Sequence, residues 1–246
     1  MSADPPSDLG QRRIELAANL AVVEARIAAA CAAVGRDRDD VRLIAATKTF
    51  PASDIRLLAD LGVLDIGENR DQEAAPKAAE LRTTPAAQPI RWHFIGALQT
   101  NKSASVVEYA TFVHSVDRLR LVKALGVAAS RAGSVVSCLI QVDLDDVSRS
   151  GRSGARPAEV SGIARAIAST PGLQIAGVMA VAPLDADPAP AFRHLAELAT
   201  QVRERHPEAT MISAGMSNDL EQAIANGSTH LRVGAALLGN RRHPVG

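Results

Sequence analysis

Residues 43–51, LIAATKTFP, join an apolar run to the polar triplet Thr47-Lys48-Thr49. Such a run is typical of a buried strand. Two interpretations of Lys48 are open at this point. One takes Lys48 as the first solvated residue after a strand, because lysine is rarely buried. The other takes it as an amine held at the mouth of a barrel, where it forms a Schiff base with a carbonyl group. The rest of the chain distinguishes the two.

Strand-like and helix-like segments alternate after a long first helix. Residues 8–34 predict that helix, because apolar residues recur at spacings of three and four and Gly35 can end it. The expected strands are 41–47, 63–67, 91–96, 112–116, 137–144, 174–182, 210–215 and 230–238. The expected helices between them are 52–61, 70–82, 102–109, 117–132, 157–169, 188–206 and 218–226.

This alternation predicts the fold. Strands that alternate with helices indicate parallel βαβ units, and eight of them in a chain of 246 residues predict a closed (β/α)8 TIM barrel with an additional N-terminal helix. The alternative is an open doubly wound sheet, but no G-x-G-x-x-G sequence follows the first strand. We expect one domain over residues 1–246, with a tail at 241–246.

Composition narrows the classes of partner. The formal net charge is zero and aromatic residues make up 2% of the chain, so we expect neither nucleic acid nor a membrane as a partner. Cys31 and Cys138 lie far apart without a metal-type spacing, and we expect both to be buried, reduced thiols. No signal peptide or spanning helix is recognised in the sequence, which predicts a cytoplasmic protein.

Candidate site residues gather where the expected strands end, because TIM barrels carry their active sites at the carboxyl ends of the strands. These residues are Lys48, Asn69, Met179, the segment SAGMSND at 213–219 and the segment RVGAALLG at 232–239. His93 and His114 lie on the third and fourth expected strands. We interpret His114 as a core or rim histidine and leave the role of His93 open.

The last two segments predict a phosphate site. Ser213, Gly215 and Ser217 lead into a helix, and Asn218 with Glu221 has the spacing of a capping box. Small residues let backbone amides approach an anion, and the start of a helix adds unpaired N–H groups. Gly234 and Ala235 offer further amides on the last strand. The alternative is that these are ordinary turn and capping residues.

A phosphate-bearing aldehyde would use both the lysine and the phosphate site, and pyridoxal 5′-phosphate (PLP) is a cofactor of this shape. Arg232 lies two residues before Gly234, so both share one face of the strand. A guanidinium there would donate to the pyridine nitrogen and leave it unprotonated, which weakens the cofactor as an electron sink. The alternative for Arg232 is a salt bridge at the barrel rim.

Seven ordered motifs carry a resemblance to a known family. TKTFP, IGENRDQE, WHFIGALQTNK, HSVD, GVMAVAP, SAGMSND and GSTHLRVGAALLG together resemble the pyridoxal phosphate homeostasis protein family over residues 15–240. Its members are single-domain proteins similar to the barrel half of bacterial alanine racemase. The resemblance implies a PLP-binding protein of intracellular vitamin B6 homeostasis, without an efficient catalytic reaction.

The same resemblance assigns roles to residues. It implies that Lys48 forms the Schiff base, that Asn69 lies near the ring substituents and that Arg232 lies at the pyridine nitrogen. Around the phosphate it places Ser213, Gly215, Met216, Ser217, Gly234 and Ala235. Met179 is a further candidate for cofactor binding, and no metal is expected. Apo forms of PLP-dependent enzymes are the expected acceptors, and the expected oligomeric state is a monomer or a weak homodimer.

The chain departs from the family pattern at two places. Phe50 stands where many members have a second lysine, which puts any transfer role of that neighbour in doubt. Arg149 and Arg152 lie in DVSRSGRSG, where relatives often have a lysine before Ser-Gly. A second lysine adduct at that place is therefore not expected.

Two alternatives to the carrier function are enzymes. A PLP-dependent amino-acid racemase, or a related enzyme of low activity, needs an acid or base on each face of the cofactor. The sequence ends soon after the last expected strand, and its single tyrosine, Tyr109, is expected outside the barrel mouth. We therefore expect no efficient racemase. A Schiff-base aldolase without cofactor would lack visible absorbance.

Overall fold

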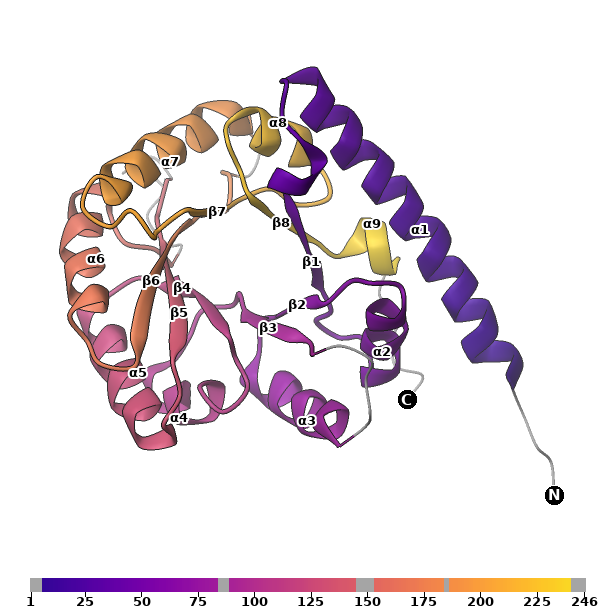
Figure 1. Ribbon diagram of the computed structural model, residues 1–246, viewed down its shortest axis with the longest axis horizontal. Helices are drawn as coiled ribbons and strands as arrows, with labels where there is room; N and C mark the ends of the chain where they lie inside the picture. Colours follow the sequence, from indigo (N-terminus) through magenta and orange to yellow (C-terminus); the bar gives the residue numbers. More distant parts are fainter. Residues whose placement is uncertain (1–5, 84–88, 145–152, 184–185, 240–246) are drawn as a thin grey trace.

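Eight parallel strands form a closed barrel in the computed structural model, which describes residues 6–83, 89–144, 153–183 and 186–239. The strands pair in chain order and β8 closes on β1 (Figure 1). They are β1 (Arg42–Ala46), β2 (Asp65–Glu68), β3 (Arg91–Phe94), β4 (Phe112–Val116), β5 (Val136–Gln141), β6 (Leu173–Met179), β7 (Met211–Ser213) and β8 (His230–Val233). The predicted TIM barrel is confirmed, and the open doubly wound sheet is excluded.

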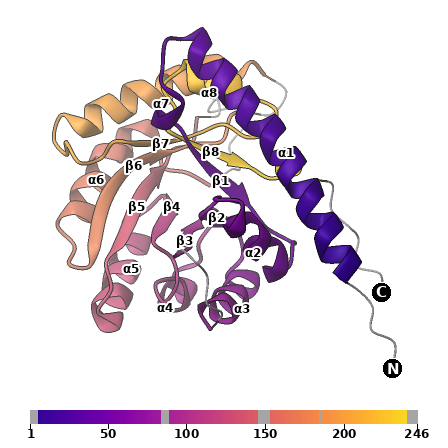
Figure 2. The same cartoon turned by 45° about the vertical axis from the view of Figure 1, so that its right-hand side comes forward.

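Helices surround this barrel (Figures 1 and 2). They are α1 (Pro6–Ala33), α2 (Ala52–Asp60), α3 (Asp71–Arg82), α4 (Ser103–Val106), α5 (Leu119–Ala132), α6 (Val160–Ala168), α7 (Pro188–Arg203), α8 (Leu220–Ala225) and α9 (Ala235–Leu238). Short 3-10 turns precede α4 and α6, at Thr100–Lys102 and Pro157–Glu159. The expected tail at 241–246 and the segment with Arg149 and Arg152 lie outside the described residues.

The last expected strand was too long. β8 ends at Val233, and residues 235–238 form the helical turn α9. The amides of Leu237 and Leu238 both donate to the carbonyl oxygen of Gly234, which closes that turn. Both leucine side chains are buried. A short apolar run such as AALL fits a buried strand and a buried helical turn equally well, so periodicity alone could not separate them.

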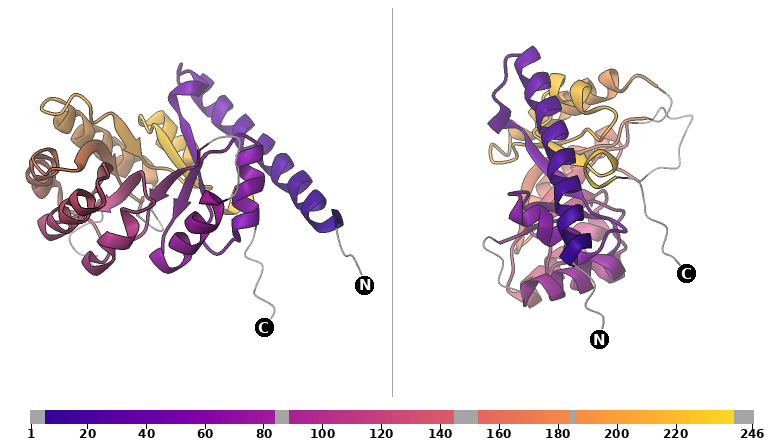
Figure 3. Two further views of the ribbon diagram at one scale, coloured as in Figure 1. Left: turned by 60° about the horizontal axis from the view of Figure 1, so that its bottom comes forward. Right: turned by 90° about the vertical axis from the view of Figure 1, so that its right-hand side faces the viewer.

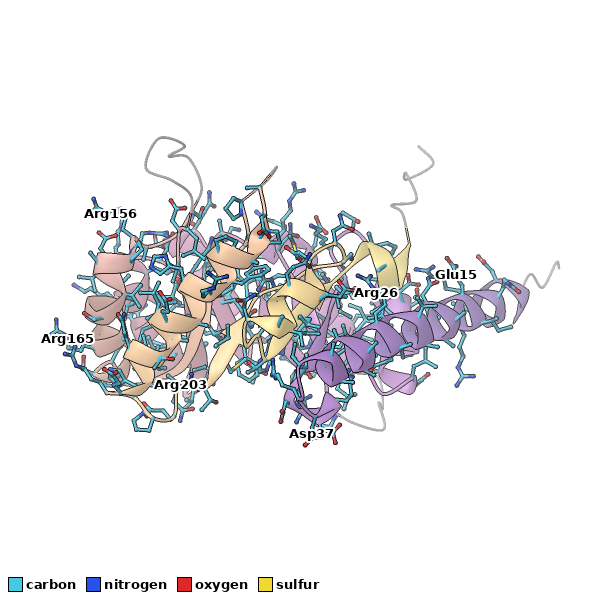
Figure 4. All side chains as sticks on the ribbon, turned by 90° about the horizontal axis from the view of Figure 1, so that it is seen from above. Glu15, Arg26, Asp37, Arg156, Arg165 and Arg203 are labelled. Carbon is cyan, nitrogen blue, oxygen red and sulfur yellow. The ribbon has the colours of Figure 1, made fainter. Side chains whose placement is uncertain are left out.

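Helix α1 lies along the outside of the barrel, against α8, α9 and α2 (Figure 3). Its buried row is Leu16, Val23, Ile27 and Cys31, with helical spacing. Arg26 lies beside α8 and pairs with Glu221 at 2.8 Å (Figure 4). By length and composition, residues 8–33 also pass as a helix that could cross a membrane, although no spanning helix is expected from the sequence. Here the buried row packs against the barrel.

The interior of the barrel holds a small apolar cluster and a group of polar side chains. The cluster consists of Leu139, Ala176, Met179 and Met211, with Phe112 packed against it. Around the barrel, the much larger apolar core fills the space between strands and helices. Cys138 belongs to that core, and both cysteines are buried and free, as predicted.

Candidate functional site

Lys48 lies two residues beyond β1, at the carboxyl end of the barrel, and its side chain is exposed. The backbone on both sides of it is fixed. The Thr47 amide donates to the Gly67 carbonyl oxygen at 2.9 Å, and the Thr49 amide donates to Glu73 Oε2 at 3.0 Å. Within the described part of the chain, no residue forms a hydrogen bond or ion pair with the Lys48 amine. The backbone of this lysine is thus fixed, while its amine is free of contacts from the described residues.

The residue after this lysine has an unusual backbone. Thr49 has a φ of 70°, and it is the one residue other than glycine with a positive φ among the described residues. A β-branched residue in this region is strained by about 1–2 kcal/mol. The bond from its amide to Glu73 helps to hold the strained turn in place. Because this turn sets the direction in which the chain leaves Lys48, we interpret the strain as part of the site.

The buried acid Glu68 supports the loop that carries Lys48 (residues 47–50, the lysine loop) from outside the barrel. Glu68 Oε1 accepts from the Thr47 hydroxyl at 2.6 Å and from Lys77 Nζ at 2.7 Å. Lys77 Nζ also donates to the Thr47 carbonyl oxygen at 3.1 Å. Burial raises the pKa of Glu68, and the bonds from Lys77 and Thr47 act in the opposite direction. Glu68 therefore supports the loop that carries Lys48.

Phe50 also anchors this loop. Its half-buried ring packs on the main core, and the guanidinium of Arg12 lies 5.7 Å from the ring centroid. Arg12 in turn bonds Asp54 at 2.7 Å and the Leu238 carbonyl oxygen at 3.0 Å. Phe50 is thus an apolar anchor, which ties the loop to α1 through Arg12.

The loops after β7 and β8 lie next to the lysine loop. β8 pairs with β1, and a Cβ added to Gly234 would lie 3.3 Å from the carbonyl oxygen of Ala46. Gly215 has a φ of 93°, and a Cβ there would lie 2.6 Å from the Cβ of Ala223, so only glycine fits. The Ala236 amide donates to Ser217 Oγ at 3.3 Å, which joins the two loops.

The expected capping box at 218–221 does not form. α8 begins at Leu220, one residue after Asp219, and no side-chain cap is present. Instead, Asp219 Oδ1 accepts from the Met216 amide at 2.6 Å. Aspartate readily bonds nearby backbone amides in turns, and this bond orders the loop rather than the helix start. Met216 itself is exposed at the edge of the loop.

Asn69 presents a buried oxygen atom without a partner. Its Oδ1 has no hydrogen bond among the described residues, although it is buried. A Cβ on Gly96 would lie 2.1 Å from the Asn69 carbonyl oxygen, so the glycine lets this segment lie against the end of β3. Buried polar atoms are normally hydrogen-bonded, and an exception calls for an explanation such as a missing ligand group.

Arg232 is buried in the barrel, and its hydrogen-bond partners among the described residues are all neutral. Its Nη1 donates to the Ser213 carbonyl oxygen at 2.7 Å and to Ser213 Oγ at 2.6 Å, and its Nη2 donates to the Ala180 carbonyl oxygen at 2.8 Å. The alternative prediction, a salt bridge of Arg232 at the barrel rim, is wrong, because Arg232 forms no ion pair with any described residue. Burial lowers the pKa of Arg232 to about 10, which leaves it cationic near neutral pH.

Ser213 and Met179 lie next to each other on neighbouring strands, beside this arginine. Met179 is buried in the interior cluster. The Ser213 hydroxyl is already bonded to Arg232 and, at 3.0 Å, to His114 Nδ1. Ser213 thus lies at the site, but its hydroxyl is engaged by Arg232 and His114.

The interior histidines form a group that the sequence did not reveal. His93 bonds Asp65 at 2.9 Å and His114 at 2.9 Å, and its ring stacks on Phe112. His114 is buried as predicted, yet it belongs to this polar group. Nothing in the spacing of Asp65, His93 and His114 shows that they meet, because the barrel register brings them together. Their one shared signal is that each is a titratable residue on a strand of the barrel.

These histidines predict a dependence of stability on pH. Burial lowers the pKa of His93 and His114, and it lowers that of His230 to about 4. An unfolded histidine titrates near pH 6.5, so below that pH the unfolded chain binds protons that the folded chain does not. As the pH is lowered from about 6.5 to about 4, we expect the free energy of unfolding to fall by up to about 1.4 kcal/mol per pH unit for each such histidine.

Urea unfolding at several pH values measures the slope of the free energy of unfolding against pH. His230→Asn should reduce it, since the substitution removes one group that is neutral when folded. His194→Asn is the matched control, because His194 is exposed on α7. A slope that His230→Asn leaves unchanged would contradict the prediction.

Comparisons with known proteins agree with this geometry. The family model of the alanine racemase N-terminal domain matches residues 15–242. The pyridoxal phosphate homeostasis protein of Mycobacterium tuberculosis is 42% identical over 244 residues, which cover 94% of this chain and 95% of the relative. The structure of PipY from Synechococcus elongatus with PLP bound has a TM-score of 0.78 and 32% identity, and the match covers 91% of this chain and 100% of that one.

Alanine racemase from Corynebacterium glutamicum is similar in fold alone. It has a TM-score of 0.66 and 15% identity, and the match covers 95% of this chain and 64% of the racemase chain.

Proposed function

This chain belongs to the pyridoxal phosphate homeostasis protein family, and we propose that it binds PLP and serves in vitamin B6 homeostasis as a carrier without efficient catalysis. One observation carries the proposal. Lys48, whose exposed amine has no partner among the described residues, lies beside the loops after β7 and β8, and the buried cation Arg232 lies on the strand that leads to Gly234.

The described residues fit this cofactor. When bound, PLP supplies an electrophilic aldehyde and an electron-withdrawing ring. Lys48 would hold it through a Schiff base, and the loop amides around Gly215, Ser217 and Gly234 would hold its phosphate. The side-chain oxygen of Asn69, buried without a hydrogen bond among the described residues, supports a polar contact with the cofactor at this place.

Arg232 gives the site its chemical bias. A guanidinium has only N–H donors, so Arg232 would donate to the ring nitrogen and give it no proton. Without a proton there, the ring withdraws electrons less strongly. This favours holding the cofactor over reactions at the α-carbon of an amino acid.

The second candidate function is a PLP-dependent racemase of low activity, which the racemase-like fold favours. It would need a second acid or base at the mouth. Of the described groups, Glu68 is bound by Thr47 and Lys77. The Tyr109 hydroxyl bonds Asp71 at 3.4 Å outside the barrel, and burial raises its pKa. Glu68 supports the loop that carries Lys48 through Oε1, and Tyr109 bonds outside the barrel, so we favour the carrier.

Two assays on the loaded protein test this choice. We expect transfer of PLP to the apo form of a PLP-dependent enzyme, which regains activity, and negligible racemisation of L-alanine by circular dichroism. Lys48→Ala is the control in both. Racemisation on the order of 1 per second or faster that Lys48→Ala abolishes would make the protein an enzyme. The oligomeric state, a monomer or weak homodimer, stays a prediction.

A further inference from the structure

A continuous chain of hydrogen bonds crosses the barrel interior from Asp65 to Arg232. Asp65 Oδ1 lies 2.9 Å from His93 Nε2, and His93 Nδ1 lies 2.9 Å from His114 Nε2. His114 Nδ1 lies 3.0 Å from Ser213 Oγ, which lies 2.6 Å from Arg232 Nη1. All five side chains are buried. Asp65 and Arg232 lie on β2 and β8, which do not pair with each other.

The arginine end fixes the direction of these bonds. A guanidinium only donates, so Ser213 Oγ accepts from Arg232. The hydroxyl proton of Ser213 must then point elsewhere, and His114 Nδ1 is the ring nitrogen beside it. That nitrogen is therefore an acceptor, and His114 carries its proton on Nε2. This proton is donated to His93 Nδ1.

The carboxylate end fixes the same direction independently. Asp65 is bound by Arg91 as well as by His93, and these bonds hold its pKa below the usual range against the effect of burial. An ionised carboxylate only accepts, so His93 carries its proton on Nε2 and accepts at Nδ1. The reversed chain would need a doubly protonated histidine in the interior, and burial disfavours that charge.

We propose that His93 and His114 are positioning residues, which hold the Ser213 hydroxyl as an acceptor and thereby fix the Arg232 guanidinium. For the cofactor this rests on the proposed function. Arg232 donates its two Nη1 protons to the carbonyl oxygen and Oγ of Ser213, and one Nη2 proton to the carbonyl oxygen of Ala180. Its Nε–H and its second Nη2–H have no partner among the described residues, so these donors remain for a ligand.

The chain acts on both parts of the site. Ser213 ends β7, and the loop with Gly215 and Ser217 follows directly. The same serine therefore links the ring side, through Arg232, to the phosphate side, through the loop. Without His114, the hydroxyl would lose its acceptor and could rotate away from the arginine. A buried polar group left in this way is unfavourable, so we expect Ser213 and Arg232 to rearrange together.

The first test uses the protein without cofactor. Nitrogen-15 NMR of the histidine rings near neutral pH should show neutral His93 and His114, both with the proton on Nε2. The Arg232 guanidinium should show hindered rotation, which His114→Leu relieves and His114→Gln restores, because glutamine can both accept and donate. A proton on Nδ1 of His114, or an arginine equally hindered in His114→Leu, would overturn the proposal.

The second test measures PLP binding and the absorption spectrum of the complex. His114→Leu should weaken PLP binding about tenfold, as expected for one hydrogen bond to a charged group, and should shift the absorption maximum. Met211→Leu is the control, because Met211 lies in the interior cluster outside the chain. Unchanged affinity and spectrum in His114→Leu would refute the positioning role. Absence of PLP binding by the unmodified protein would refute the proposed function. The NMR test would still show whether the hydrogen bonds from Asp65 to Arg232 run as proposed.

Discussion

Borohydride reduction of the protein loaded with PLP is expected to fix a pyridoxyl group on Lys48, and Lys48→Ala is expected to abolish the labelling. The amine is exposed and has no partner among the described residues. The backbone on both sides of it is anchored, through Thr47 to β2 and through Thr49 to α3. A free amine on a fixed loop meets an aldehyde with little loss of conformational entropy. Weak binding through the phosphate should survive in the variant.

Two other lysines near this end of the barrel make the result specific. Lys77 Nζ donates to Glu68 at 2.7 Å and to the Thr47 carbonyl oxygen, so its amine is already engaged. Lys102 lies 3.9 Å from Asp71. Peptide mass mapping after reduction identifies the labelled residue, and Lys102→Ala is the matched control that should keep full labelling. Label found mainly on the peptides with Lys77 or Lys102 would reject the assignment of Lys48.

The position of this lysine could be predicted because it depends on topology alone. A residue directly after a parallel strand must lie at the carboxyl end of the barrel, whatever the details of packing. The same reasoning places Asn69 and Gly234 at that end. The ends of strands were harder to predict, because an apolar run such as residues 235–238 satisfies both periodicities.

The support around the site could not be predicted, because it depends on register and on side chains from distant segments. Only the fold shows that Glu68 is bonded by Lys77, nine residues later in the sequence. The strained φ of Thr49 has no sequence signal, since threonine rarely adopts it. The pairing of β2 with β3, and of β3 with β4, decides that Asp65, His93 and His114 meet.

The loops after β7 and β8, which would hold the phosphate, lead to a prediction about affinity. PLP is expected to bind at least about a hundredfold more tightly than pyridoxal, because pyridoxal lacks the phosphate. A hydrogen bond to a charged group contributes about 1.5–3 kcal/mol. Two such bonds at the lower value give about 3 kcal/mol, which is about a hundredfold in affinity. Titration of the protein with each compound, followed by absorbance, measures the difference.

Ser217→Ala separates the phosphate contribution from the rest of the site. Ser217 Oγ also accepts from the Ala236 amide at 3.3 Å, so its loss loosens the junction of the two loops that would hold the phosphate. The substitution should therefore weaken PLP binding several-fold and leave pyridoxal binding unchanged. Ser169→Ala, at the exposed end of α6, is the control that should alter neither. If PLP and pyridoxal bound equally well, these loops would not form a phosphate site, and Lys48 would have to hold its ligand through the ring alone.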